Sequence, residues 1–349
     1  PGVAKVSEAI YKNKKLFNKN KIKKNSVGIV TDGSSVLGLG DIGAEAALPV
    51  MEGKAMLFKQ LANIDAFPIC LNTKNTFKII ETVKNISPVF GGINLEDISA
   101  PRCFEIEEKL LNIGIPVMHD DQHGTAIVVL AALINSCKVL NKKFDDLKVV
   151  VSGAGAAGNA ISKLLVCAGY HEKICKSVCD IIVCDSKGII YEGRKKLNKY
   201  KKRLAKLTNR NKVEGYLEDA LENADVFIGV SVGKILNKKM IKNMKKNPVI
   251  FSLANPTPEI MPNLAKKFGA KIIATGRSDF PNQVNNALAF PGVFRGALDI
   301  GAKKITDMMK INAAYALAKT VKKTNVNKIL PSIFDKKVVI NISKAVMES

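Results

Sequence analysis

Short apolar runs alternate with stretches of helical periodicity along most of this chain. The runs at residues 26–31 and 66–71 predict buried strands, and the periodicity at residues 6–17 and 73–85 predicts helices. A longer apolar stretch at residues 124–140 predicts a buried helix. Strands and helices that alternate in this way indicate an α/β fold built on a parallel sheet.

A glycine-rich turn follows the next predicted strand, at residues 148–152. The turn reads Gly-Ala-Gly-Ala-Ala-Gly and leads into another predicted helix. Strand, glycine turn and helix in this order let the pyrophosphate of a dinucleotide approach the helix N-terminus. The sequence therefore predicts a Rossmann-like unit whose cofactor-binding residues are Gly153, Gly155, Ala156, Ala157 and Gly158.

The second strand of this unit, at residues 181–185, ends on Asp185. An acid at this position is expected to accept hydrogen bonds from the ribose hydroxyls of NAD. Ser186 and Lys187 follow directly, with Arg194, Lys195 and Lys202 beyond them, and could bind the 2′-phosphate of NADP instead. The sequence thus leaves both NAD and NADP open as the cofactor.

Asparagines follow two later predicted strands. Asn255 stands at the end of the run at residues 248–254, and Asn286 belongs to an amide-rich loop at residues 281–286. Ligands of α/β proteins bind at such strand ends. The amides suit a substrate carboxylate or a nicotinamide carboxamide, although a plain turn is the commoner meaning of an Asn-Asn pair.

Two pairs of acids follow apolar runs in the first third of the chain. Glu96 and Asp97 come after residues 87–90, and Asp120 and Asp121 come after residues 113–118. Both runs predict short buried strands, and acids at neighbouring strand ends can converge on one point. Carboxylates that converge repel one another unless a cation lies among them, and hard oxygen ligands select Mg²⁺ or Mn²⁺. The alternative is that these acids are solvated turn residues or helix caps.

A lysine stands near the predicted start of a helix at residues 49–59. Lys54 lies among Gly53, Ala55 and Met56, and the positive end of a helix and an apolar setting both disfavour an ammonium. A lysine with a lowered pKa is a candidate general base. An exposed lysine at a helix start is the alternative interpretation.

The run His-Asp-Asp-Gln-His at residues 119–123 resembles the helical zinc motif His-Glu-x-x-His. Its second residue is Asp rather than Glu, and the run follows a predicted strand and ends in Gly124. We therefore do not expect a zinc protease.

Composition limits the classes of partner. The net charge is +23, but the excess is mostly Lys spread from Lys12 to Lys344, and the chain has no Trp, so a solvated basic surface is favoured over a nucleic-acid partner. No uninterrupted apolar run is long enough for a membrane span, and seven irregularly spaced cysteines suit a reducing cytoplasm. A cytoplasmic protein with no nucleic-acid or membrane partner is expected.

Taken together, the motifs make the chain resemble the short-form malic enzymes. The likeness runs from residue 1 to about residue 322 and rests on a set of motifs, among them PGVA at 1–4, VLGLGDIG at 36–43, PVMEGKA at 49–55, NLEDI at 94–98, HDDQHGTA at 119–126, GAGAAG at 153–158, SLANPTPE at 252–259, TGRSDFPNQVNN at 275–286 and FPGVFRGALD at 290–299.

This resemblance implies the oxidative decarboxylation of L-malate to pyruvate and carbon dioxide, with reduction of NAD or NADP and a need for Mg²⁺ or Mn²⁺. It implies that Lys54 is the general base with Asp120 as its helper, that the metal ligands are Glu96, Asp97 and Asp121, and that Asn255 and Asn286 hold the substrate. The general acid of the family is a Tyr that stands two residues before the PGVA run, ahead of residue 1. Ser35 occupies the place of a substrate-binding Arg found in the long form, which agrees with the short form.

Two domains are expected in a chain of 349 residues. Residues 1–126, joined by C-terminal helices within 286–349, are predicted to form a smaller α/β substrate and metal domain. Residues 127–285 are predicted to form the Rossmann-like NAD(P)-binding domain. The resemblance also implies a homodimer. The rival interpretations are a metal-free amino-acid dehydrogenase and a basic nucleic-acid-binding protein.

Overall fold

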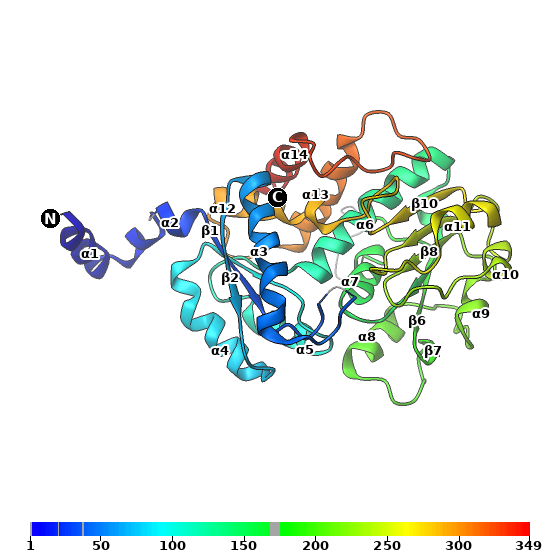
Figure 1. The fold of residues 1–349 in the computed structure, drawn as a ribbon, viewed down its shortest axis with the longest axis horizontal. Coiled ribbons are helices and arrows are strands. Elements are labelled where there is room, and N and C mark those ends of the chain that lie inside the picture. Colours follow the sequence, from blue (N-terminus) through cyan, green and yellow to red (C-terminus); the bar gives the residue numbers. More distant parts are fainter. Residues whose placement is uncertain (1, 20, 37, 168–174) are drawn as a thin grey trace.

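The computed structural model describes residues 2–19, 21–36, 38–167 and 175–349. One parallel and one mostly parallel sheet form two lobes, and the long helix α6 (Asp120–Leu140) runs between them (Figure 1). Buried apolar residues from both lobes form a continuous core around α6. The α/β architecture predicted from the apolar pattern is confirmed.

The first sheet has four parallel strands in the order β2-β1-β3-β4. Its strands are β1 (Ser26–Thr31), β2 (Asp65–Cys70), β3 (Gly92–Leu95) and β4 (Val117–His119), and its helices are α3 (Gly43–Ala62), α4 (Thr76–Ile86) and α5 (Arg102–Leu110). The strand expected at residues 87–90 is wrong, because residues 87–89 form a short 3-10 turn that contains Pro88. The true strand β3 begins at Gly92 and still ends at the first acid pair.

The second sheet has the order β10-β9-β8-β5-β6-β7 and is parallel except for β7. Its strands are β5 (Lys148–Ser152), β6 (Asp180–Asp185), β7 (Gly188–Ile189), β8 (Val226–Gly229), β9 (Val249–Ser252) and β10 (Ile272–Thr275). The helices of this lobe are α7 (Ala156–Leu165), α8 (Lys199–Leu207), α9 (Leu217–Leu221), α10 (Lys238–Lys242) and α11 (Pro262–Phe268). From β5 the chain adds β6 and β7 on one side of the sheet, and then β8, β9 and β10 on the other side. This strand order is that of a dinucleotide-binding sheet.

Among the described residues, helix α6 has the length and composition of a membrane span, but most of it is buried inside the molecule. It packs against α7 and α13 (Asp307–Thr320), and its apolar side chains lie in the core. Its role in the described structure is therefore that of a central core helix.

The C-terminal helices return to the first lobe. Helix α12 (Phe290–Asp299) packs on α3, where the rings of Phe290 and Phe294 lie 4.6 and 5.5 Å from that of Phe58. Helices α13 and α14 (Lys337–Met347) pack against each other, and α14 also packs on α12. These contacts agree with the prediction that C-terminal helices join the first domain, and the domain boundaries themselves stay a prediction.

The N-terminal helix α1 (Gly2–Lys12) extends away from the body of the molecule (Figure 1). It ends five residues earlier than the sequence predicted and has no buried residue. The short elements η1 (Lys14–Lys19) and α2 (Lys21–Lys24) connect it to β1.

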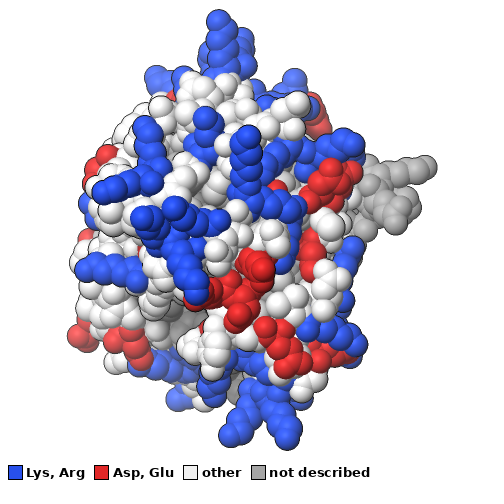
Figure 2. Space-filling view, turned by 90° about the vertical axis from the view of Figure 1, so that its right-hand side faces the viewer, with Lys and Arg blue, Asp and Glu red and all other residues white. Residues whose placement is uncertain are grey.

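Basic residues are distributed over the surface. Figure 2 shows Lys and Arg side chains scattered over one face, with acidic side chains between them rather than a single basic stripe. Among the described cysteines, Cys167 and Cys175 form a disulfide, which the expectation of a reducing cytoplasm did not include.

Candidate active site

The two acid pairs meet at one edge of the first sheet. In the parallel pairing of β3 with β4, Leu95 lies opposite His119, so the residues that follow both strands emerge side by side. Carboxylate oxygens of Glu96, Asp97 and Asp121 all lie within 4.8 Å of one another. The convergence predicted from the strand ends is therefore present in the fold.

These three carboxylates are held close at an electrostatic cost. Burial, aided by the neighbouring carboxylates, raises the pKa of Asp97 to about 9, that of Glu96 to about 7 and that of Asp121 to about 6. Asp97 has a left-handed backbone (φ 51°), and its N–H donates to Asp121 Oδ2 at 2.8 Å. Its own Oδ2 is buried with no hydrogen-bond partner. An orphaned oxygen among three clustered carboxylates fits a hard divalent cation.

Lys54 lies directly against this cluster. Its Nζ is 2.5 Å from Glu96 Oε2 and also hydrogen-bonds to Asp120 Oδ2. The ammonium lies 4.3 Å from the centre of the Phe290 ring, and the Lys54 side chain is buried. A buried lysine between two carboxylates is well placed to exchange a proton.

Two details of the Lys54 prediction are wrong. Helix α3 begins at Gly43 and includes Pro49, so Lys54 lies in the helix interior, where the dipole of the N-terminus does not act. Burial lowers the Lys54 pKa as expected, but the charges of Asp120, Glu96 and Asp121 outweigh it and raise that pKa. With these carboxylates ionised around it, Lys54 is held as an ammonium.

Asp120 links Lys54 to the C-terminal part of the chain. Its Oδ2 also accepts from Asn286 Nδ2 at 2.5 Å, at the start of η4 (Asn286–Leu288). A Cβ on Gly124 would overlap Asp120 Oδ1, so only glycine fits one turn further along α6. Asp120 is completely buried, and burial raises its pKa to about 6. The donor of Asn286 is thus directed to Asp120, and its predicted contact with substrate stays a prediction.

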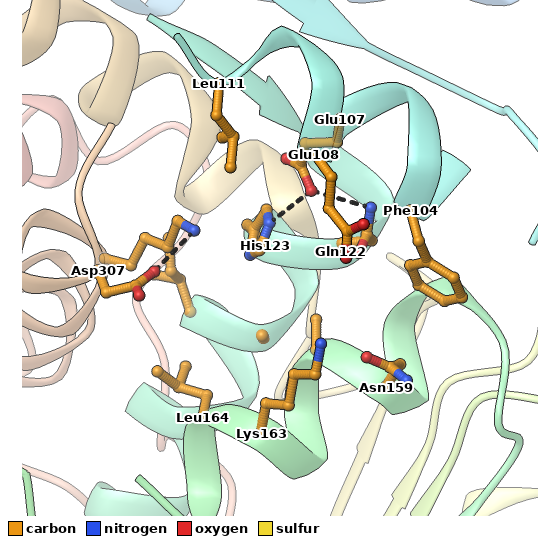
Figure 3. Close-up of a pocket in the computed structure, with 14 residues that line it drawn as sticks. Phe104, Glu107, Glu108, Leu111, Gln122, His123, Asn159, Lys163, Leu164 and Asp307 are labelled. Carbon is orange, nitrogen blue, oxygen red and sulfur yellow. Dashed lines mark hydrogen bonds and ion pairs between the residues drawn. The ribbon is translucent and has the colours of Figure 1, made fainter. Parts of the chain in front are cut away.

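Glu107 of α5 was missed by sequence reasoning. Its carboxylate accepts from the His119 N–H at 2.8 Å and from Gln122 Nε2 at 3.1 Å, and lies 3.0 Å from His123 Nε2. Figure 3 shows Glu107, Gln122 and His123 among the side chains that line a cavity of about 320 Å³. Burial raises the pKa of Glu107, but the His123 charge outweighs it and the pKa falls to about 2.

Glu107 therefore holds the start of α6 through its contacts with the His119 N–H, Gln122 and His123. The sequence contained one signal for Glu107: it is an acid on the apolar face of an amphipathic helix, between Ile106 and Leu110. The two histidines of the zinc-like run are not among the clustered metal-ligand candidates of the described residues.

A cavity of about 480 Å³ joins the cluster to the second lobe. Residues from the predicted metal, cofactor and substrate sets line it together: Ser35, Asp97, Asp121, Gly155, Ala156, Ala157, Asn255 and Asn286. Gly38 (φ 68°) brings the loop before α3 against the carbonyl oxygen of Asn255, where a Cβ would overlap. No tyrosine is among the described residues that line this cavity.

The glycine turn after β5 has the geometry of a dinucleotide loop. Gly153 has φ 118°, and a Cβ on Gly158 would overlap the Gly153 carbonyl oxygen. Gly155 has open space around its Cα and faces both cavities of the second lobe. The second of these cavities, of about 640 Å³, runs from Gly153 to Asp185 at the end of β6.

Asp185 is already engaged in the structure. Arg194 Nη2 donates to both of its oxygens at 2.8 and 2.7 Å, and Lys201 Nζ donates to Oδ2 at 2.6 Å. Burial raises the pKa of Asp185, but these cations outweigh it and hold that pKa below its usual value. The predicted ribose contact of Asp185 would compete with these donors.

Comparison with known proteins gives a consistent result. Residues 122–349 match the family model described as malic enzyme, NAD binding domain, and residues 4–78 and 76–111 match malic enzyme, N-terminal domain. The bifunctional malic/malolactic enzyme of Bacillus subtilis (strain 168) is 53% identical over 353 residues, covering 100% of this chain and 84% of that protein. The NAD-dependent malic enzyme of Geobacillus stearothermophilus is 52% identical, covering 100% and 72%.

A solved structure shows the same fold. The NAD-dependent malic enzyme of Thermotoga maritima superposes with a TM-score of 0.94 at 50% identity, covering 99% of this chain and 90% of that one. The NADP-dependent malic enzyme of Escherichia coli (strain K12) is 48% identical over 320 residues, 91% of this chain and 41% of the longer relative. Relatives of both cofactor types are therefore similar to this chain. Family models across both lobes and relatives of this identity show that the chain belongs to the malic enzyme family, the NAD- or NADP-dependent oxidoreductases that the sequence motifs predicted.

Proposed function

We propose that the protein catalyses the oxidative decarboxylation of L-malate to pyruvate and carbon dioxide, with reduction of NAD or NADP. The observation that carries the proposal is the contact of the buried Lys54–Asp120 pair with the three-carboxylate cluster, beside a cavity shared with the dinucleotide glycines. Oxidation of a 2-hydroxy acid needs a base at the hydroxyl, a hydride acceptor and a site for the carboxylates. Candidates for the cofactor and carboxylate sites line this cavity, and the candidate base Lys54 contacts the carboxylate cluster at its edge.

Glu96, Asp97 and Asp121 would hold a divalent cation, Mg²⁺ or Mn²⁺. The donor set is entirely oxygen, and the unpartnered Asp97 Oδ2 fits this cation. When bound, the cation supplies Lewis acidity toward the hydroxyl and keto oxygens of the substrate, and the nicotinamide accepts the hydride.

Lys54 is the proposed base for the C2 hydroxyl proton. The carboxylates that now favour its ammonium form include two of the cation ligands. Once Glu96 and Asp121 are neutralised as ligands, the burial that lowers the Lys54 pKa has less opposition. The amine can then accept the hydroxyl proton and return it later.

Asp120 and the asparagines complete the proposed site. Asp120 positions Lys54 through its hydrogen bond and is itself positioned by Asn286. Asn255 lines the cavity opposite the cluster, where its amide would bind a substrate carboxylate or the nicotinamide carboxamide. The Phe290 ring covers the Lys54 amine and limits water near the proton.

The test is an absorbance assay at the reduced-nicotinamide band with L-malate, Mn²⁺ and each cofactor, with pyruvate and carbon dioxide measured as products. The Lys54→Gln variant should lose about 10²- to 10⁴-fold in kcat, the usual contribution of a general base. Its affinity for the dinucleotide should stay within about twofold, because Lys54 lines neither cavity that the glycine turn faces. Lys59→Gln, on the exposed face of the same helix, is the matched control and should retain activity.

Two results would contradict the proposal. An equal loss of turnover and of dinucleotide affinity in Lys54→Gln would deny it the role of base. Full turnover after complete chelation of divalent cations would favour a metal-free dehydrogenase instead.

A further inference from the structure

The cavity of about 320 Å³ beside Glu107 lies between the two lobes. Its walls come mainly from α5 of the first lobe, α7 of the second lobe, the central helix α6 and α13. None of the metal-ligand candidates, and none of the glycines at residues 153–158, is among the described residues that line it. It is therefore a candidate binding site separate from the active-site cavity.

A buried amide without a partner lines this cavity. Asn159 follows the glycine turn on α7 and is 1% exposed. Neither its Oδ1 nor its Nδ2 has a hydrogen-bond partner among the described residues. Buried side-chain amides are nearly always hydrogen-bonded, because an unpaired polar group loses its hydration without compensation. A ligand that pairs with Asn159 would remove this cost.

An ammonium without a partner stands one turn further along the same helix. Figure 3 shows Lys163 and Asn159 on α7, across the cavity from Glu107 and Gln122. Lys163 makes no hydrogen bond and no ion pair within the described part of the chain. Its side chain is partly buried, and burial lowers the pKa of its ammonium. A partly desolvated cation of this kind favours an anionic ligand.

The other charged side chains of the cavity already have partners. These are three contacts: Glu107 lies 3.0 Å from His123, Glu108 lies 3.2 Å from Arg203, and Asp307 lies 3.1 Å from Lys310. Only Lys163 therefore has a charge left for a ligand. One positive charge suits a carboxylate, whereas a phosphate monoester of about −1.5 to −2 charges would have a single free cation among three acids.

The rest of the wall is largely apolar. Phe104, Leu111, Ile127 and Leu164 line the cavity beside the two polar side chains of α7. A few polar groups that fix orientation, set in an apolar wall, are typical of sites for small organic molecules. The body of the ligand is therefore expected to be a short hydrocarbon.

We propose that this cavity binds a small aliphatic carboxylic acid, whose carboxylate pairs with Lys163 Nζ and accepts a hydrogen bond from Asn159 Nδ2. The hydrocarbon body packs against the apolar wall. Such a ligand contacts α5 of the first lobe and α7 of the second lobe at the same time. This inference does not rest on the proposed oxidation of malate.

The test compares 4-methylpentanoate with its neutral isostere 4-methylpentanamide by isothermal titration of the full chain. The acid should bind with a Kd of about 1 mM or lower, as is reasonable for a ligand of roughly eight non-hydrogen atoms. The amide should bind at least about tenfold more weakly, because it lacks the charge-assisted contact. Equal affinities for the acid and the amide, or no binding of the acid, would overturn the proposal.

Lys163→Gln should abolish most of the advantage of the acid and leave the affinity for the amide within about twofold. Lys109→Gln is the matched control, because Lys109 is exposed on α5 and does not line the cavity. It should keep the advantage. Equal losses in the two variants would assign the effect to general surface charge, and unchanged affinity in Lys163→Gln would place the acid elsewhere, so either result would overturn the proposal.

Asn159→Ala supplies a second readout. It should weaken binding of the acid by about tenfold, the usual effect of losing a hydrogen bond to a charged group. Without ligand, its thermal midpoint should be equal to or higher than that of the wild type, since the amide has no partner to lose. A lower midpoint together with unchanged affinity for the acid would make the amide structural and overturn the proposal.

Inorganic phosphate is the remaining probe. It should bind this cavity more weakly than 4-methylpentanoate, because it carries more charge and has no hydrocarbon body. Tighter binding of phosphate that is lost in Lys163→Gln would identify a phosphate site and overturn the assignment of a carboxylic acid.

Discussion

Asp97 combines three unfavourable features in one residue. Its backbone is left-handed, its carboxylate is buried beside two others, and one oxygen has no partner. Each feature costs free energy in the isolated protein, and strain of this kind collects at ligand sites. A bound divalent cation offsets the second and third costs together.

Asp97→Asn removes one anionic donor and preserves the shape of the side chain. We expect the Kd for Mn²⁺ to rise by at least about tenfold, because ligand charge sets the affinity of such sites. Without an added cation, the thermal midpoint should be equal to or higher than that of the wild type, since Asn stays neutral beside the other two carboxylates without having to bind a proton. Isothermal titration and thermal unfolding measure the two effects.

The control for this variant is Asp146→Asn, which lies on the surface away from the cluster. It should change neither Mn²⁺ affinity nor the thermal midpoint. Unchanged Mn²⁺ affinity in Asp97→Asn would remove Asp97 from the ligand set.

Several site residues could be predicted from the sequence, and the pKa of Lys54 could not. The metal-ligand candidates follow apolar runs, and parallel strands end at a common edge, so local pattern was enough to bring Glu96 and Asp121 together. The direction of the Lys54 pKa depends on how α3 faces β3 and α6, which no local pattern contains. The same holds for Glu107, whose partners lie on another helix.

At the scale of elements, the turn between β5 and α7 contains two glycines that are required for different reasons. Gly158 is required by the fold, because a Cβ would overlap the Gly153 carbonyl oxygen. Gly155 has no neighbour within 4 Å of such a Cβ and an ordinary backbone angle (φ −83°). The fold therefore tolerates a Cβ at residue 155, and glycine is required there only if a ligand closely approaches the helix N-terminus.

Gly158→Ala should lower the free energy of unfolding by about 1–3 kcal/mol, the usual cost of overpacking. Gly155→Ala should leave unfolding within about 0.5 kcal/mol, as for a surface change, yet weaken dinucleotide binding. Chemical denaturation and nucleotide titration measure the two effects. If Gly155→Ala bound the dinucleotide normally, the pyrophosphate would not lie on this turn.

The errors in helix boundaries have identifiable causes. Helix α3 was expected to begin near Pro49, because proline favours the first turn, but buried Ala44 and Ala47 anchor an earlier start. Helix α6 was expected to begin at Gly124, yet it begins at Asp120, where acids interact well with the helix N-terminus. Tertiary contacts decided both boundaries, and such contacts are not encoded in a short window of sequence.

At the scale of the whole molecule, the cluster couples stability to pH. The raised pKa values mean that the folded protein retains protons that the unfolded chain releases, between about pH 4 for free carboxyls and about pH 9 for Asp97. In this window the cluster's contribution to stability falls as pH rises. Cation binding displaces the same protons, so it becomes more favourable as pH rises.

Excess Mg²⁺ should therefore raise the thermal midpoint more at about pH 8 than at about pH 6. Differential scanning calorimetry with and without the cation measures the difference. In Asp97→Asn the dependence on pH should be weaker. An equal rise at both pH values, or a larger one at the lower pH, would contradict this linkage.

In the part of the chain that the structure describes, helix α1 packs mainly against the neighbouring η1 and buries none of its residues. It is amphipathic, none of its residues is buried, and Val3 and Val6 are exposed. We expect a homodimer in which this helix packs on the second copy, since an isolated helix of this length is marginal in water.

Deletion of α1 should shift the molar mass measured by light scattering from dimer toward monomer. The thermal midpoint should become less dependent on protein concentration, as expected when association no longer contributes. A wild-type monomer, or a deletion variant that remains a stable dimer, would contradict this expectation.

The most direct test of the account is the location of Mn²⁺ in crystals by anomalous diffraction. A single strong peak should lie among Glu96, Asp97 and Asp121, within about 2.0–2.3 Å of one oxygen from each and beside the Lys54 amine. Absence of a peak there at saturating Mn²⁺, or a peak held by other residues, would contradict the account.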